Sequence, residues 1–135
     1  MIHGARWNSP GRRVIYAAET YAGGLLEVLV HATGAMPANQ SYIRIDIPRD
    51  IRVERLEAAD LPGWDAEDLI VSRAHGDLWY DSRRTAVLVV PSVVARVEHI
   101  VLINQEHLQF KRISATDPMP VRWDARLWSH RQFHA

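Results

Sequence analysis

The chain contains no cysteine, only one lysine and no net charge. Without cysteine it forms no disulfide and offers no thiolate as a nucleophile or metal ligand. A formal net charge of zero gives no overall attraction to nucleic acid or to an anionic membrane. Because Lys111 is the only lysine among 16 basic residues, the other 15 are arginines, whose planar fork suits carboxylates and phosphates. These absences argue against RNA binding.

Long apolar runs are also missing. No run approaches the about 20 residues that span a bilayer, and the N-terminal segment "MIHGARWNSPGRR" lacks the apolar core of a signal peptide. We therefore expect a soluble protein of the cytoplasm. A length of 135 residues, of which 47% are hydrophobic and 24% charged, predicts one domain over residues 1–135 with a substantial core.

The pattern of apolar residues predicts more strands than helices. Strands are expected where apolar and polar residues alternate or short apolar runs occur, at 14–18, 42–47, 51–57, 86–92, 99–104 and 110–114. Helices are expected at 20–33 and 65–75, and the segment 120–128 mixes a last strand with a helical turn. Gly76 is expected to end the second helix. This irregular order predicts an α+β fold rather than a series of βαβ units.

Several common motifs are absent. The sequence has neither of the glycine-rich phosphate loops, no H-E-x-x-H metal motif and no G-x-S-x-G serine motif. Two acid–histidine pairs occur, Glu98 with His99 and Glu106 with His107. Neighbouring residues point apart on a strand, so neither pair resembles a metal site and no metal is expected.

Glu27 is the single acid in the apolar run "GGLLEVLVHA". Burying a lone carboxylate costs several kcal/mol unless it is paired or hydrogen-bonded. On a helix its neighbours at three and four residues include Gly23, Gly24 and His31. The two glycines have no side chains to cover the carboxylate. We therefore expect this face of the helix to form the bottom of a ligand pocket, with Glu27 held away from water. A surface pair between Glu27 and His31 is the alternative.

Three segments carry a resemblance to a known family: "GARWNSPGRRVIYAAETYAGGLLEVLVHA", "VVPSVV" and "LINQEH". Over residues 4–128 the chain resembles the RES domain family, the toxins of bacterial Xre/RES toxin–antitoxin pairs. The arginine, glutamate and serine that give the family its name correspond to Arg6, Glu27 and Ser92. Further matches are Gly76, Asp77 and Trp79 in one segment, and Asp124, Arg126 and Leu127 near the end.

The resemblance implies an ADP-ribosyltransferase-like fold of the diphtheria-toxin type, with central mixed β-sheets flanked by a few helices. It implies an enzyme that cleaves the nicotinamide–ribose bond of NAD+. The ADP-ribose would pass to a protein such as phosphoribosyl pyrophosphate synthetase, or to water or phosphate. The implied partner is an antitoxin of the Xre/MbcA/ParS type, without direct contact to nucleic acid or membrane. The alternative is a non-enzymatic interaction module or a toxin that acts on RNA.

The resemblance also assigns roles, each beside an ordinary structural alternative. Glu27 stabilises the cationic ribose of the transition state. Arg6 binds the pyrophosphate or a ribose oxygen, or else forms a salt bridge that ties down the N-terminal segment. Tyr16 stacks on the nicotinamide ring, or belongs to the core. Ser92 presents a hydroxyl at a strand end, or forms a turn. Asn104 holds the amide or ribose, or caps a turn.

Overall fold

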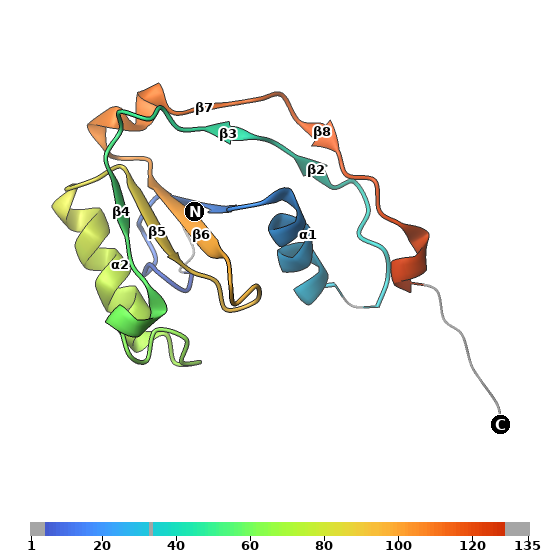
Figure 1. Cartoon of the computed structure of the whole chain (residues 1–135), viewed down its shortest axis with the longest axis horizontal. Helices are drawn as coiled ribbons and strands as arrows, with labels where there is room; N and C mark the ends of the chain where they lie inside the picture. The colour runs from blue at the N-terminus through green and yellow to red at the C-terminus, as the bar shows by residue number, and fades with distance from the viewer. Residues whose placement is uncertain (1–4, 33, 129–135) are drawn as a thin grey trace.

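The computed structural model describes residues 5–32 and 34–128 (Figure 1). Its helices and strands in chain order are β1 (Val14–Ala18), α1 (Tyr21–Val30), β2 (Ser41–Tyr42), β3 (Ile45–Asp46), β4 (Val53–Arg55), α2 (Ile70–Ser82), β5 (Val87–Pro91), β6 (His99–Asn104), β7 (Ser114–Ala115) and β8 (Met119–Pro120). Short 3-10 turns lie at Ala58–Asp60, Leu108–Arg112 and Ala125–Trp128. The predicted α+β class, with mixed sheets and a few helices, is confirmed.

A four-stranded sheet in the order β1-β6-β5-β4 forms the centre of the fold. The pairs β1–β6 and β5–β6 are antiparallel, whereas β4 and β5 are parallel. Every residue of β5 is buried. A strand covered on both faces carries a continuous apolar run instead of alternating polar residues, which explains the sequence "VLVVP".

The two faces of β5 contribute to different parts of the core. Leu88 packs with Trp79 of α2, while Val87 packs with Ile51 on the opposite face. Trp79 is fully buried and donates its indole N–H to the hydroxyl of Thr85 at 2.9 Å. Helix α2 thus covers one face of the sheet (Figure 1). Neither helix in the described ranges is long and apolar enough to cross a membrane.

Two short strand pairs form a ribbon that extends away from this sheet (Figure 1). β3 pairs with β7 and β2 pairs with β8, both antiparallel. Helix α1 packs against β1 and lies below the ribbon in Figure 1. The ring of Tyr21 on α1 meets the ring of Tyr42 on β2 edge to face, with centroids 4.7 Å apart. Aromatic contact therefore joins helix and ribbon.

The sequence pattern predicts the positions of the main helices and strands but not all of their boundaries. β1 and β6 occupy the predicted ranges 14–18 and 99–104, and β5 and α1 lie within 86–92 and 20–33. The predicted helix 65–75 is wrong in position. α2 begins at Ile70 and continues through Gly76 to Ser82, because Gly76 serves a close packing contact rather than a helix end.

The predicted strand 110–114 is also wrong. Residues Leu108–Arg112 form a 3-10 turn, which begins where the His107 ring nitrogen accepts a hydrogen bond from the Gln109 N–H at 3.0 Å. Only Ser114 belongs to the following strand, β7. The predicted strands 42–47 and 51–57 are shorter than expected, the first being divided into β2 and β3 and the second reduced to β4.

Candidate functional site

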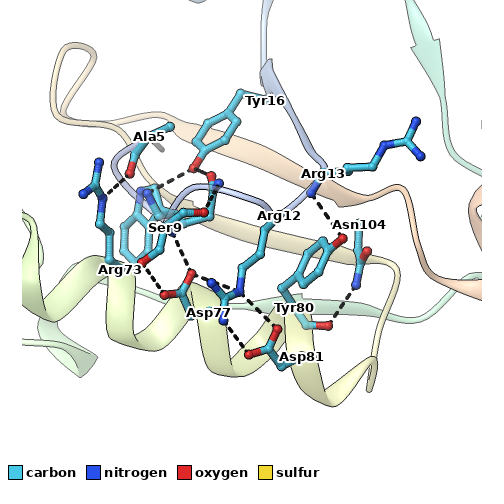
Figure 2. Close-up of polar contacts among 12 residues, drawn as sticks. Ala5, Ser9, Arg12, Arg13, Tyr16, Arg73, Asp77, Tyr80, Asp81 and Asn104 are labelled. Carbon is cyan, nitrogen blue, oxygen red and sulfur yellow. Dashed lines mark hydrogen bonds and ion pairs between the residues drawn. The ribbon is translucent and has the colours of Figure 1, made fainter. Parts of the chain in front are cut away.

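The segment after the described N-terminus is a tight turn held against α2. The N–H groups of Ala5 and Asn8 each bond to the other residue's carbonyl, at 2.9 and 3.4 Å. The Ser72 hydroxyl donates to the Arg6 carbonyl at 2.7 Å. Arg73 Nε donates to the Ala5 carbonyl at 2.8 Å (Figure 2). Helix α2 therefore satisfies the main-chain acceptors of this turn and fixes its position.

Acidic residues further along α2 hold the rest of the same loop. Asp77 accepts hydrogen bonds from the main-chain N–H and the hydroxyl of Ser9, at 2.8 and 2.6 Å. Arg12 forms ion pairs with Asp77 at 3.4 Å and Asp81 at 2.7 Å (Figure 2). The hydrogen bond from Arg12 lowers the pKa of Asp81. Because Arg73, Asp77 and Asp81 are spaced by four residues, they share the face of α2 that meets the loop.

Tyr16 on β1 is fixed by two hydrogen bonds to this loop. Its hydroxyl donates to Asn8 Oδ1 at 2.6 Å and accepts from the Trp7 N–H at 3.0 Å (Figure 2). Asn8 is fully buried. Burial raises the pKa of Tyr16 to about 12, so the phenol is neutral at physiological pH. The ring is thus held in one place.

A cavity of about 730 Å³ lies between this loop, β1, α1, α2 and the turn after β5. Its lining includes Arg6, Tyr16, Glu27, Arg73, Val93 and Val94. Concave sites for small ligands usually measure about 300–1,000 Å³. The fold thus brings three of the five predicted site residues, Arg6, Tyr16 and Glu27, to one cavity large enough for a small molecule.

Glu27 enters the cavity from α1 and is half-buried. The expected dry pocket is therefore partly open to solvent. Across the described ranges, the Glu27 carboxylate makes no hydrogen bond or ion pair, so the alternative pair with His31 is not formed, although His31 also lines the cavity. An unpaired acid in a concave site is available to a ligand.

The two glycines before Glu27 have different surroundings. Gly24 lines the cavity, and a β-carbon there would meet only Ala18 Cβ, at 3.7 Å. Gly23 is buried instead, and a β-carbon there would lie 2.7 Å from Glu98 Oε1. Thr20 caps the helix by accepting from the Gly23 N–H at 2.9 Å, and it donates to Glu98 at 2.8 Å. Only Gly24 keeps the cavity floor open.

Arg6 is held by main-chain carbonyls. Its Nη1 donates to the carbonyls of Ala66 at 3.1 Å and Trp64 at 3.4 Å. No carboxylate of the described residues forms an ion pair with Arg6, so the predicted alternative of a salt bridge is not observed there. The indole ring of Trp64 stacks on that of Trp7, with centroids 6.2 Å apart and planes 15° apart. The aromatic pair packs beside the arginine.

Ser92 lies next to the cavity but does not line it. Only 2% of the residue is exposed, and its Oγ accepts a hydrogen bond from the Ala95 N–H at 2.9 Å. The residues on either side, Pro91 and Val93, belong to the cavity lining. In this geometry the Ser92 hydroxyl stabilises the turn that forms one cavity wall.

Asn104 lies at the other end of β6 and does not line the cavity. It is fully buried, with Nδ2 donating to the Tyr80 carbonyl at 3.1 Å and Oδ1 accepting from the Glu106 N–H at 2.8 Å. Figure 2 shows Asn104 beside Tyr80, apart from Ala5 and Arg73. These contacts are those of a residue that caps a turn, which is the alternative role that the sequence offered for Asn104.

Two residues of the site were not singled out from the sequence. Asn8 positions the Tyr16 hydroxyl, and Arg73 lines the cavity. The signal for Arg73 is its spacing of three and four residues before Gly76 and Asp77, which places it on the same face of the helix.

Among the described lining residues, the charged ones are one acid and two arginines, Glu27, Arg6 and Arg73. This balance suits a ligand that combines anionic groups with a centre that becomes positive. Within residues 5–32 and 34–128, no group of three His, Cys, Asp or Glu side chains is arranged to hold a metal ion.

Comparison with known proteins identifies the family. Residues 1–124 match the model of the RES domain. The chain is 38% identical over 131 residues to a Prs ADP-ribosylating toxin of Sphingobium sp. (strain YBL2), covering 93% of this chain and 81% of the relative. It is 33% identical over 128 residues to a Toxin Res of Pseudomonas putida, covering 91% and 85%. A Toxin Res of Yersinia enterocolitica is 29% identical over 129 residues, covering 93% and 84%.

The match over residues 1–124 and the relatives named Toxin Res define the chain as a RES domain toxin. The chain belongs to the RES domain family, and the predicted membership is confirmed.

Proposed function

We propose that this chain is an NAD+-consuming toxin of a bacterial toxin–antitoxin pair. It cleaves the nicotinamide–ribose bond and transfers ADP-ribose to an acceptor. The observation that carries the proposal is the meeting of Arg6, Tyr16 and Glu27 at one cavity. Similarity to the Sphingobium toxin, whose name states ADP-ribosylation, supports it. The proposal includes an ADP-ribosyltransferase fold of the diphtheria-toxin type, as one domain over residues 1–135.

Glu27 supplies the electrostatic part of the reaction. When the bond between the nicotinamide nitrogen and ribose C1′ breaks, nicotinamide leaves with the electron pair and the ribose becomes cationic. A carboxylate that has no hydrogen-bond or ion-pair partner among the described residues is free to stabilise that charge. The acceptor nucleophile then bonds to C1′ and releases its proton to solvent. Removing one such stabilising group typically costs about 10²–10³-fold in rate.

Arg6 and Tyr16 bind and orient the substrate in this proposal. Arg6 uses only Nη1 for hydrogen bonds to described residues, which leaves the rest of the fork for a phosphate or ribose oxygen. Tyr16 is neutral and fixed, so its ring provides a flat surface for the nicotinamide. Ser92 contributes through the turn that it caps. Asn104 is given no contact with substrate.

The acceptor is proposed to be a protein, and specifically phosphoribosyl pyrophosphate synthetase. The support is the name of the Sphingobium relative, which gives Prs as the protein it modifies. In a bacterial lysate supplied with labelled NAD+, this acceptor predicts one labelled protein band. If water or phosphate is the acceptor instead, nicotinamide appears at full rate without added protein and no band is labelled.

The test of the reaction is nicotinamide release from NAD+ by the purified full chain, in the presence of phosphate or lysate. Glu27→Gln should lower the rate by about 100-fold or more. The control is Glu106→Gln, because Glu106 is paired with Arg13 and does not line the cavity. No release with any of these acceptors, or full activity of Glu27→Gln, contradicts the proposal.

An antitoxin partner of the Xre/MbcA/ParS type is part of the proposal. Leu26 and Val30 on α1 are 39% and 55% exposed, and Val30 lines the cavity, which supports a protein surface at the cavity mouth. Addition of the cognate antitoxin should stop nicotinamide release. If the chain is instead a non-enzymatic interaction module, its toxicity does not require Glu27. The Glu27→Leu variant would then remain toxic in cells.

A further inference from the structure

Arg73 is a second arginine at the cavity, contributed by α2 (Figure 2). Its Nε is committed to the Ala5 carbonyl at 2.8 Å. The two terminal nitrogens of its guanidinium group make no hydrogen bond to any residue that the structure describes. The bond from Nε therefore fixes the direction of the side chain, while its terminal nitrogens keep their hydrogen-bond donors for a ligand of the cavity that Arg73 lines.

The charge of Arg73 is not neutralised by the protein in the described ranges. No carboxylate there forms an ion pair with Arg73 or with Arg6. Arg12, which anchors the same loop, has ion pairs with both Asp77 and Asp81. Within the described ranges, Arg6 and Arg73 thus lack the ion pairs that Arg12 has. Arg6 and Arg12 belong to the loop before β1, and Arg73 contacts it. Uncompensated guanidinium groups at a concave site favour an anionic ligand.

The two arginines meet at the N-terminal turn, and both line the cavity. Arg73 Nε reaches the Ala5 carbonyl, and Arg6 is the next residue of that turn. Burial raises the pKa of Tyr16, and the charges of Arg73 and Arg6 both oppose that rise, which is consistent with two cations close to the phenol. Glu27, the only acid among the described lining residues, comes from a different element, α1.

We infer that Arg73 is a substrate-binding residue that contacts the pyrophosphate of the dinucleotide, together with Arg6. This inference rests on the proposed function. A pyrophosphate carries two negative phosphates, and planar guanidinium forks bind such oxygens with directed, charge-assisted hydrogen bonds. With both phosphates on the arginines, the ribose next to nicotinamide extends toward Glu27. Arg73 therefore selects for NAD+ over nicotinamide nucleosides without phosphate.

A purely structural role for Arg73, through the Ala5 carbonyl, is the competing explanation. The test compares Arg73→Gln with Arg12→Gln, which removes another link between the loop and α2 but does not touch the cavity. Arg73→Gln should raise KM for NAD+ by about tenfold or more and change kcat by less than about threefold. For nicotinamide riboside, which has no phosphate, the same substitution should change kcat/KM by less than about twofold.

Arg12→Gln should leave KM for NAD+ within about twofold of wild type. If Arg73→Gln loses activity equally toward NAD+ and nicotinamide riboside, or if Arg12→Gln raises KM as much, the inference is overturned. Arg73→Lys keeps the charge but not the fork, so it should recover only part of the affinity for NAD+.

Titration with inorganic pyrophosphate gives a readout that needs no turnover. Wild type and Glu27→Gln should bind pyrophosphate with similar affinity, and Arg73→Gln about tenfold more weakly. Equal affinity of Arg73→Gln and wild type overturns the inference while leaving the NAD+ reaction standing. Pyrophosphate binding that depends on Arg73, in a protein that releases no nicotinamide, supports the anion site and contradicts only the proposed function.

Discussion

The main-chain carbonyl of Trp7 lies directly against Gly76 on α2, in the space that a β-carbon would occupy. A backbone atom cannot turn aside as a flexible side chain does. The contact therefore requires glycine in the middle of a helix, where glycine costs about 1 kcal/mol relative to alanine.

Gly76→Ala should consequently displace the loop that carries Arg6. We expect a loss of about 3 kcal/mol in the free energy of unfolding, measured by denaturant titration, together with a loss of nicotinamide release. Leu78→Ala is the control on the same helix, because Leu78 is 61% exposed and should cost little. A Gly76→Ala variant with wild-type stability would contradict the tight contact.

Gly24→Ala should act in the opposite direction on stability. The added β-carbon meets only Ala18, and replacing a helical glycine by alanine stabilises by about 0.5–1 kcal/mol. Because Gly24 lines the cavity, the same change should raise KM for NAD+. Gly23→Ala is the matched comparison, since its β-carbon would displace Glu98 and offset the gain. Equal stabilisation by both substitutions would contradict the distinction between the two glycines.

Tyr16→Phe should destabilise the protein by about 1–3 kcal/mol, because Asn8 Oδ1 and the Trp7 N–H lose their partner. The pH dependence has a defined sign. The folded protein holds the phenol proton with a pKa of about 12, above the unfolded value of about 10. The stabilising effect is therefore complete below pH 10 and is lost as the pH rises toward 12.

Denaturation of wild type and Tyr16→Phe from pH 8 to 11 measures this effect. The wild type should lose stability more steeply than the variant above about pH 10. Tyr21→Phe, on the half-exposed Tyr21, is the control and should keep the wild-type dependence. Identical curves for wild type and Tyr16→Phe would show that Tyr16 is not held in the neutral form.

Ser92→Ala tests how the serine that the resemblance predicts for the site acts. Loss of its hydroxyl leaves the Ala95 N–H unpaired, so stability should fall by about 1 kcal/mol. Because Ser92 acts through the turn that forms one wall of the cavity, kcat/KM should fall by less than about tenfold. This loss is far smaller than that expected for Glu27→Gln. Ser82→Ala removes a comparable bond to the Trp79 carbonyl, away from the cavity, and should leave kcat/KM unchanged. A loss in Ser92→Ala equal to that in Glu27→Gln would instead indicate direct contact with substrate.

The fold was predictable where one physical signal dominates. Strands β1 and β6 carry apolar runs ended by polar residues, and both were predicted at their observed limits. The helix α2 was misplaced because glycine was interpreted as a stop signal. Gly76 is required by its contact with the Trp7 carbonyl. Because Trp7 lies far from Gly76 in the sequence, the pattern of residues around Gly76 does not indicate this contact.

Glu27 could be predicted as a candidate site residue from the sequence, because a lone acid among leucines needs an explanation. Arg6 and Tyr16 followed from the family resemblance rather than from the pattern of residues. Arg73, one of 15 arginines, was missed because its spacing before Gly76 and Asp77 becomes informative only when α2 is oriented against the loop. Asn104 was included as a polar strand end, a position that turn capping also produces.

The anchoring of the N-terminal turn by α2 has a consequence for inhibitors of this protein. A compound need not compete with a charged dinucleotide in the cavity. One that separates Ser9 from Asp77 would release the turn and move Arg6 away from its neighbours. The contact to disrupt then lies outside the cavity.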